Sequence, residues 1–286
     1  TALVFSPARA GQSRATDSSP ACALAKAAHA DAALNVPFRI VDGRIYVTAK
    51  VNGKGPFVFA VDTGASGMGR ADASLVAALN LPIAGLSHTS DGVATAEVKT
   101  VRLSSIALGG LVRHDLEVVT RDYVSKMARE ASFSAILGRE FFGDGLLIID
   151  YPAQRLIFTR AAALNPGGQD VLSYERAFRV PVRIGDTLTT GNLDTGANVS
   201  FVLPRPLLDR VDGGAIEAAG NGKLTNTVVS TGKATVRGPF RIGAVTLSNV
   251  EIRVSDRYPE LLVGAHALQH FVMLIDQRSK QIALCR

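Results

Sequence analysis

The chain contains the same segment twice. Residues 136–160 read ILGREFFGDGLLIIDYPAQRLIFTR, and residues 262–286 read LVGAHALQHFVMLIDQRSKQIALCR. The two segments align without a gap: each begins with two apolar residues and a glycine, carries an aspartate at the same place after an apolar run, and ends in arginine. A duplicated unit predicts two similar halves that pack against each other about a pseudo-twofold axis.

The repeat also sets the expected boundaries. One unit spans residues 38–160 and the second spans residues 171–286, joined by a linker at 161–170 that is rich in Ala, Gly and Pro. Residues 1–37 precede the first unit, and residues 13–36 are polar and then Ala-rich. We interpret residues 1–37 as a signal remnant followed by an arm or pro-segment outside the repeated units.

Both units read as successive short strands. Val, Ile and Leu are frequent, and two-residue turn signals of the Asn-Gly and Asp-Gly type separate apolar runs. These signals are Asp42-Gly43, Asn52-Gly53, Asp91-Gly92 and Asn221-Gly222. Helical periodicity is confined to residues 70–81 and to short stretches after Gly138 and Gly264. The pattern predicts an all-β fold.

Each unit carries one Asp-Thr-Gly-Ala sequence. The first lies in FVFAVDTGASG, residues 57–67, and the second in GNLDTGANVS, residues 191–200. Asp and Gly are common turn residues, so a single copy could be a plain turn. Turn chemistry does not explain why both units keep the same four residues while much of the remaining sequence differs. The repeat therefore favours a functional role for Asp62 and Asp194.

A twofold arrangement would bring these two aspartates face to face. Two carboxylates that share a site cannot both ionise cheaply, so one retains a proton. The pair could hold a water, with one Asp as general base and the other as a donor to a substrate carbonyl. Gly64 and Gly196 would let backbone N–H groups approach each carboxylate. Thr63 and Thr195 would form hydrogen bonds across the twofold axis and hold the two loops together.

At these residues the sequence resembles the aspartic proteases. Its single-chain layout is similar to pepsin, and its Asp-Thr-Gly-Ala loops are similar to retropepsins and to bacterial exported proteins of the aspartyl protease type. The resemblance implies two duplicated β-barrel lobes with a cleft between them, hydrolysis of polypeptides without a cofactor or metal, and a monomer. It also implies that residues 136–138 and 262–264 pack over the Asp loops in a ψ-shaped motif.

The resemblance further implies substrate-contacting residues and flaps. The loop positions Ala65, Ser66, Ala197 and Asn198 would face the substrate, and hairpin tips at Ser90, Asp91, Gly92, Asn221 and Gly222 would close over the cleft. The sequence departs from the family at three places. Retroviral enzymes carry Asp where Ser66 and Asn198 stand, the region 86–100 lacks the tyrosine of the pepsin flap, and Gly-Asn-Leu replaces an apolar run before Asp194.

The net charge of the chain and the sequence near its N-terminus indicate which partners it binds and in which compartment it acts. The net charge is +6, yet no Lys/Arg run is interleaved with aromatic residues, which argues against nucleic-acid binding. No stretch is apolar for long enough to span a membrane. The apolar start followed by Ala8-Arg9-Ala10 is typical of a signal-peptide remnant and predicts export to the periplasm or outside the cell. A disordered, Ala-rich tail is the alternative.

Two cysteines, Cys22 and Cys285, lie near opposite ends of the chain. In an exported protein they could form one disulfide, and two unpaired thiols are the alternative. His266 and His270 stand four residues apart as a conceivable metal pair, although no third ligand accompanies them and packed histidines are the simpler interpretation. There is no Gly-x-Ser-x-Gly sequence for a serine hydrolase.

The sequence therefore predicts an aspartic endopeptidase. Two alternatives remain open at this point: a non-catalytic peptide-binding module on the same scaffold, and a processing protease with one protein target.

Overall fold

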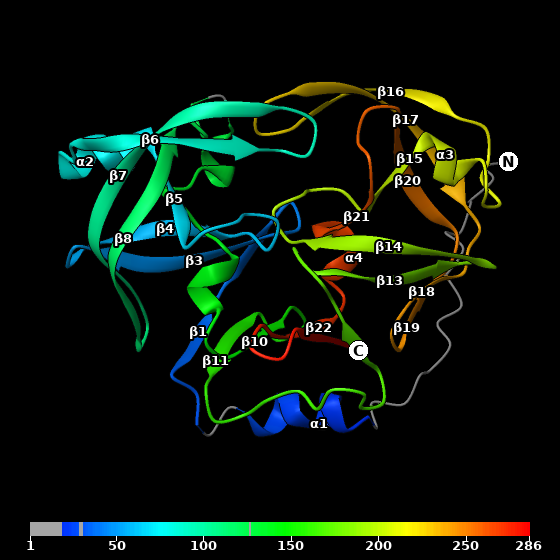
Figure 1. The fold of residues 1–286 in the computed structure, drawn as a ribbon, viewed down its shortest axis with the longest axis horizontal. Coiled ribbons are helices and arrows are strands. Elements are labelled where there is room, and N and C mark those ends of the chain that lie inside the picture. The colour runs from blue at the N-terminus through cyan, green and yellow to red at the C-terminus, as the bar shows by residue number, and fades with distance from the viewer. Residues whose placement is uncertain (1–18, 29–30, 126) are drawn as a thin grey trace, which may run out of the picture.

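The computed structural model describes residues 19–28, 31–125 and 127–286. The strands of these residues form an eight-stranded, a nine-stranded and a six-stranded sheet, which confirms the all-β, two-lobed prediction (Figure 1). The expected signal remnant with Ala8-Arg9-Ala10 lies outside the described residues. None of the helices described has the length and apolar character needed to cross a membrane.

The first lobe is built on the eight-stranded sheet, in the order β2-β3-β4-β9-β5-β8-β7-β6. Its strands are β2 (Arg39–Val41), β3 (Arg44–Val51), β4 (Lys54–Val61), β5 (Gly69–Asp72), β6 (Ile83–Ser90), β7 (Thr95–Leu108), β8 (Leu111–Arg121) and β9 (Ala135–Leu137). β3 also pairs with β7, so the sheet curls back on itself. Three short helices accompany it: α2 (Ala73–Leu79), η1 (Arg129–Ala131) and η2 (Arg139–Phe142).

The second lobe is built on the nine-stranded sheet, in the order β16-β17-β20-β15-β21-β14-β13-β18-β19. Its strands are β13 (Arg179–Ile184), β14 (Thr187–Asp194), β15 (Phe201–Pro204), β16 (Glu217–Lys223), β17 (Val228–Val236), β18 (Phe240–Ile242), β19 (Val245–Leu247), β20 (Val250–Ser255) and β21 (Leu261–Gly264). Its helices are α3 (Arg205–Leu208) and α4 (Ala265–Leu268).

The six-stranded sheet joins the two repeats, in the order β1-β11-β10-β22-β23-β12. Its strands are β1 (Leu34–Pro37), β10 (Leu146–Asp150), β11 (Arg155–Thr159), β12 (Val171–Ser173), β22 (Val272–Asp276) and β23 (Gln281–Cys285). β10 and β22, which occupy the same place in the two aligned segments, pair antiparallel with Ile148 opposite Leu274. The duplicated segments therefore pack against each other directly.

Side chains of the six-stranded sheet point alternately to its two faces, and both faces are buried. Leu147, Ile149, Met273 and Ile275 point into the main core. Their neighbours on the opposite face, including Ile148, Leu274 and Ala283, pack against α1 (Pro20–Ala27). Figure 1 shows α1 lying under this sheet, opposite the lobes.

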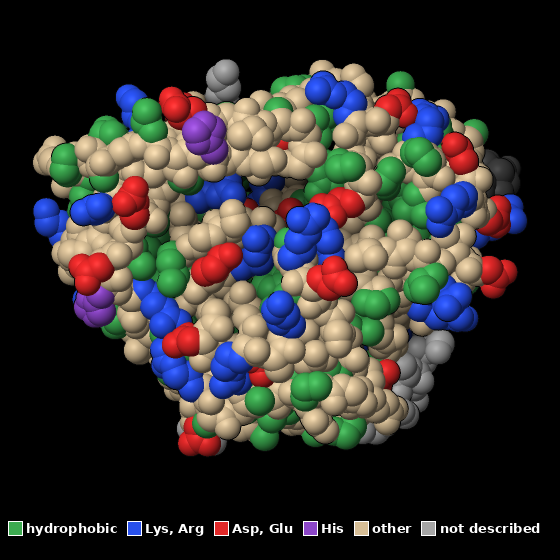
Figure 2. Space-filling view, in the orientation of Figure 1, with side chains coloured by type: hydrophobic (Ala, Val, Ile, Leu, Met, Phe, Trp, Pro, Cys, Tyr) green, Lys and Arg blue, Asp and Glu red, His purple; other side chains and the backbone are tan. Residues whose placement is uncertain are grey.

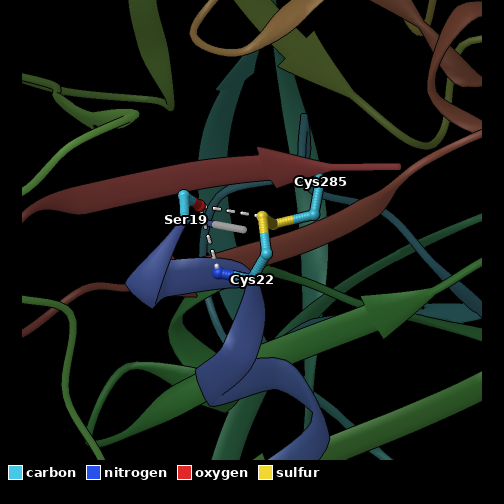
Figure 3. Close-up of a disulfide and its surroundings, with 3 residues drawn as sticks. All are labelled: Ser19, Cys22 and Cys285. Carbon is cyan, nitrogen blue, oxygen red and sulfur yellow. Dashed lines mark hydrogen bonds between the residues drawn. A yellow bond between two sulfur atoms is a disulfide. The ribbon is translucent and has the colours of Figure 1, made fainter. Parts of the chain in front are cut away.

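A disulfide between Cys22 of α1 and Cys285 of β23 confirms the predicted pairing (Figure 3). Ser19 caps the start of α1, and its hydroxyl group lies 3.1 Å from the Cys22 sulfur. Helix α1 is thus anchored below the sheet that both repeats share. The last residues of the predicted arm, 34–37, form β1 and pair with β11.

Three of the four predicted turns are confirmed. Asp42 and Gly43 join β2 to β3 with φ of 51° and 78°, and Asn52 and Gly53 join β3 to β4 with φ of 52° and 76°. Both positions have the positive φ that this turn type needs. Gly92, with φ of 86°, lies in the turn between β6 and β7.

The fourth turn prediction, at Asn221-Gly222, is wrong. Both residues lie within β16, where Asn221 pairs with Ser230 and Gly222 pairs with Val229. The register shifts between Ala218 and Asn221, and Gly220 takes the positive φ of 75°. The glycines there form an irregular strand, and the tip of the hairpin falls at residues 224–227.

The helix predicted over residues 70–81 is shorter than expected. Residues 69–72 form β5, and α2 begins only after Asp72, whose carboxylate accepts a hydrogen bond from the Ser74 N–H. Asp72 is therefore the N-cap of α2, and pairing of β5 with β8 and β9 outweighs helical periodicity before it. The short helices expected after Gly138 and Gly264 are η2 and α4.

Candidate active site

Two strands deliver the paired aspartates. β4 ends immediately before Asp62, and β14 ends at Asp194. Each strand pairs in parallel with a short strand of its own lobe, which places Val61 beside Leu137 and Leu193 beside Val263. These partners belong to the segments 136–138 and 262–264 that were expected to pack over the Asp loops, and the structure places them there.

Close backbone contact explains the glycine at the end of each of those segments. A side chain on Gly138 would collide with the carbonyl of Gly67, and one on Gly264 would collide with the carbonyl of Val199. Only glycine lets the two segments cross at this distance.

The two threonines of the loops bond across the lobes. Thr63 N–H donates to Thr195 Oγ1 at 3.1 Å, and Thr195 N–H donates to Thr63 Oγ1 at 2.9 Å. Each hydroxyl group donates in turn to the opposite strand, to Leu193 O at 2.9 Å and to Val61 O at 2.8 Å. This closed set of bonds holds the two loops in one fixed relation.

The loop backbones bond the carboxylates. Asp62 Oδ1 accepts from the N–H groups of Gly64 and Ala65 at 2.8 and 3.0 Å, and Asp194 Oδ1 accepts from that of Gly196 at 2.8 Å. Each glycine also lies against the opposite aspartate: a side chain on Gly64 would collide with the Asp194 carboxylate, and one on Gly196 with that of Asp62. The structure thus brings together Asp62, Asp194 and the four supporting residues.

The surroundings of the two carboxyl groups favour retention of one proton by the pair. Burial, followed by the negative charge of Asp62, raises the pKa of Asp194 to about 7. Hydrogen bonding with the Asp62 side chain also raises the pKa of Asp194. Two adjacent carboxyl groups with one proton can act as a base and an acid at the same time.

Two arginines that the sequence analysis did not single out support the loops. Arg139 Nη1 donates to the carbonyls of Thr63 and Gly64 at 3.3 and 3.0 Å. Arg44 crosses from the first lobe and donates to Gly196 O at 2.7 Å and to Asn198 Oδ1 at 3.0 Å. Nothing in the local pattern marks Arg44. Arg139 directly follows the glycine of the first repeated segment, where the second segment has alanine.

Asn198 therefore lies in a contact between the lobes. Its amide group donates to Asp42 Oδ2 at 2.5 Å and holds the pKa of Asp42 below its usual value. His266 Nε2 lies 3.0 Å from Asp42 Oδ1, so this histidine has a carboxylate partner. Ser66 is exposed on its own loop. Within the described ranges no cluster of three or more His, Cys, Asp or Glu side chains could hold a metal ion.

Hairpins from the two lobes join at their tips, as Figure 1 shows along its upper edge. Asn226, in the turn between β16 and β17, donates its N–H to Asp91 Oδ2 at 2.6 Å and its amide group to the carbonyls of Thr89 and Ala94, each at 2.9 Å. Arg121 then bonds the Asn226 amide oxygen at 2.8 Å and the Thr225 carbonyl at 2.9 Å. We refer to this set of contacts as the hairpin clasp.

Tyr258 lies near both the hairpin tip and the aspartates. Its ring is close to Gly92, where an added β-carbon would lie 3.6 Å from Tyr258 Cε2. Burial raises the pKa of Tyr258, and the negative charge of Asp194 adds to the effect. On the face shown in Figure 2, a hollow opens below the joined hairpins, and basic and acidic side chains are visible inside it.

The predicted flap residues separate into two groups. Ser90, Asp91 and Gly92 lie at the tip of the first-lobe hairpin, next to the clasp, whereas Asn221 and Gly222 lie along a strand and not at a tip. Asn226 takes the place expected of them. The signal that could have found it is the Asn between two threonines at 225–227, a polar turn between apolar residues.

Comparison with known proteins addresses the first lobe. A search of curated proteins found no match. A protein-family model described as "Aspartyl protease" matches residues 47–141, which include Asp62 and the segment 136–138. The first lobe is therefore similar to the aspartyl protease family, and the second lobe carries its own Asp-Thr-Gly-Ala loop in the equivalent place.

Proposed function

We propose that the protein is an aspartic endopeptidase that hydrolyses peptide bonds with a water held between Asp62 and Asp194. The observation that carries this proposal is the close approach of the two Asp loops: Gly64 lies against the Asp194 carboxylate, and Gly196 lies against that of Asp62. The raised pKa of Asp194 agrees with one shared proton. The match of residues 47–141 to the aspartyl protease model supports a peptidase in general.

The raised pKa of Asp194 suggests how the roles divide. Asp194 carries the proton and donates it to the carbonyl oxygen of the scissile bond as negative charge develops there. Asp62 accepts a proton from the water, whose oxygen bonds to the carbonyl carbon and forms a tetrahedral intermediate. When the C–N bond breaks, the proton held by Asp62 passes to the departing nitrogen, and the intermediate's hydroxyl proton returns to Asp194.

The supporting bonds act by keeping the pair in place. The Thr63–Thr195 contacts tie the loops together, and Arg139 and Arg44 hold loop carbonyls on either side. These groups need not move during the reaction, which lowers the cost of reorganisation as charge develops.

Two further properties follow as parts of the proposal. Because one chain supplies both aspartates, a monomer is sufficient for catalysis. Because disulfides persist mainly in oxidising compartments, the Cys22–Cys285 bond favours an exported protein, periplasmic or secreted.

The hairpin clasp favours a processing protease over a general one. A polypeptide that enters between the hairpins must separate Asn226 from Asp91 and Thr89, and this restricts access. A peptide-binding module without catalysis would use the same cleft, so a cleavage assay is needed to distinguish the two.

The test is digestion of a proteome-derived peptide mixture by the wild-type protein, Asp62→Asn and Asp194→Asn, each with and without a statine-type inhibitor. We expect new termini with the wild type alone, and none with inhibitor or with either variant. Circular dichroism would check that the variants remain folded. Cleavage by a folded Asp→Asn variant at the wild-type rate would refute the mechanism.

A further inference from the structure

The two lobes place different side chains at equivalent positions beside the aspartates. Side chains alternate along a strand, so the residue two places before each Asp shares its face. That residue is Ala60 in the first lobe and Asn192 in the second. The intervening residues, Val61 and Leu193, point the other way and belong to the main core.

The residues that pair with Ala60 and Asn192 on the neighbouring strands also differ between the lobes. Ala60 pairs with Tyr46 on β3 and with Ile136 on β9. Asn192 pairs with Arg179 on β13 and with Leu262 on β21. The same register therefore gives a Tyr-Ala-Ile row in the first lobe and an Arg-Asn-Leu row in the second.

The first-lobe row belongs to an apolar cluster separate from the main core. Ala60, Tyr46 and Ile136 pack with Ala65 of the Asp loop, and Phe133 covers them with its ring 6.3 Å from that of Tyr46. Tyr123 lies beside Phe133 at 6.2 Å. A substrate side chain that lies against this cluster would meet apolar and aromatic groups, which favours an aromatic or large aliphatic side chain.

The second-lobe row is polar. The Arg179 guanidinium pairs with Glu260 through two contacts of 2.5 and 2.9 Å, so its charge is balanced. Asn192 is only 7% exposed, and its Oδ1 is buried with no hydrogen-bond partner among the described residues. The Tyr258 side chain, near Asp194 and Glu260, is also buried.

A buried amide oxygen without a partner is costly and is normally satisfied by protein, water or ligand. Asn192 lies on the Asp194 face of its strand, beside the place where the proposed reaction occurs. Since the amide group can turn over, it offers an acceptor or a donor to whatever lies next to it. An acidic ligand would face Asp194 and Glu260, and a basic one would face Arg179, so the surroundings favour a neutral group.

We propose that Asn192 determines specificity: the cleft takes an aromatic or large aliphatic side chain against the first lobe and a neutral hydrogen-bonding side chain, of the Asn, Gln, Ser or Thr kind, against the second. This inference rests on the proposed function and names the class of peptide bond that the dyad would cut.

The test compares two peptides that differ at one position. Sequencing of wild-type cleavage products identifies the residues on both sides of the scissile bond. A preferred sequence is then made with Gln at the polar position and again with Met, which has a similar shape without the amide. The ratio of kcat/KM for the two peptides is measured, because a general loss of activity cancels in this ratio.

We expect the wild type to prefer the Gln peptide by about tenfold or more. Asn192→Ala, which installs the residue of the first lobe, should bring the ratio close to one, and Asn192→Leu should favour Met. Asn35→Ala is the control, since Asn35 lies on β1 of the six-stranded sheet and bonds Arg155. Its ratio should match that of the wild type.

Identical preferences on the two sides of the cut bond, or an unchanged ratio in Asn192→Ala, would overturn the inference. Binding of the same two peptides with a reduced –CH2–NH– bond, followed by fluorescence polarisation, gives a readout that needs no catalysis. A wild type that cleaves nothing but binds the Gln form more tightly, with the preference lost in Asn192→Ala, would refute the proposed function and retain the subsite. Equal binding of the two forms would refute the subsite alone.

Discussion

Thr63 and Thr195 each accept a hydrogen bond from the other's backbone N–H, although 132 positions separate them in the chain. Both side chains are buried, at 2% and 0% exposure, and each hydroxyl group also donates to the carbonyl of the opposite lobe's strand. The relative position of Asp62 and Asp194 is therefore set by contacts between the lobes, one residue away from each aspartate.

Replacement of Thr195 should weaken this contact. Thr195→Val keeps the shape but leaves the Thr63 N–H and the Val61 carbonyl without their partner, so we expect a loss of about 1–3 kcal/mol in the free energy of unfolding. Thr195→Ser retains the hydroxyl group and is the matched control. Urea unfolding measures both, and equal stability of the two variants would show that the bonds contribute little.

The retained proton on Asp194 predicts how stability depends on pH. In the unfolded chain the group titrates near 3.8, whereas in the folded protein its pKa is about 7. The folded state therefore binds the extra proton between these values, and this stabilisation, fully present below the lower value, is lost as pH rises towards the upper one.

Asp194→Asn should remove that part of the pH dependence, because an amide group does not titrate. Thermal unfolding at several pH values between 4 and 8 would show a shallower fall in Tm for this variant than for the wild type. Asp186→Asn, at an exposed turn between β13 and β14, should keep the wild-type slope. Parallel slopes for all three proteins would contradict the assignment of the proton.

The hairpin tip at Gly92 should control turnover. Gly92 has φ of 86° and lies beside Tyr258, so Gly92→Val forces a strained turn and brings a side chain into contact with the ring. We expect a large fall in kcat/KM with a loss of stability of about 1 kcal/mol. Gly53→Val is the control, since Gly53 has φ of 76° with nothing within 4 Å of an added β-carbon. If both variants cleave peptides at the same rate, the Gly92 hairpin does not act as the gate.

The hairpin clasp should depend on one side chain. Asn226→Ala removes the amide bonds to Thr89 and Ala94 and the bond from Arg121. Amide hydrogen exchange over residues 89–94 should become about tenfold faster, because loss of such bonds favours local opening. Asn221→Ala, on the same hairpin, removes a side chain that accepts a bond from the Ser230 hydroxyl group at 3.4 Å and makes no contact with residues 89–94 that is seen among the described residues, so exchange there should be unchanged. The same rate in all three proteins would mean that the clasp does not hold the hairpins together.

The disulfide should stabilise the whole chain without affecting the chemistry. It links residues 263 positions apart, and closure of so long a loop stabilises by roughly 4–5 kcal/mol in the chain-entropy model. Cys22→Ser with Cys285→Ser should lower Tm and keep peptide cleavage at temperatures where the variant is folded, because α1 lies beneath the six-stranded sheet. Mass spectrometry of the unreduced wild type checks the bond, and two free thiols would exclude it.

Local signals were sufficient for much of this protein. The gap-free repeat predicts two equivalent lobes, and two Asp-Thr-Gly-Ala loops identify Asp62 and Asp194 as the pair to examine. Asp42-Gly43 and Asn52-Gly53 mark their turns because positive φ is a requirement of the turn itself. These features depend on neighbouring residues in the chain or on a pattern that occurs twice, and both can be recognised in the sequence alone.

Contacts between segments that are distant in the chain could not be predicted from the sequence. The Asn221-Gly222 prediction is wrong because an irregular pairing with β17 places these residues inside a strand, and pairing of β5 with β8 and β9 shortens the helix expected from residue 70. The clasp at Asn226 and the support from Arg44 arise where the two lobes meet. The Asn192 amide oxygen, which has no partner among the described residues, lies where two strands meet. The sequence determined which carboxylates would pair, and the tertiary structure decided what surrounds them, because burial and partners are properties of residues that only folding brings together.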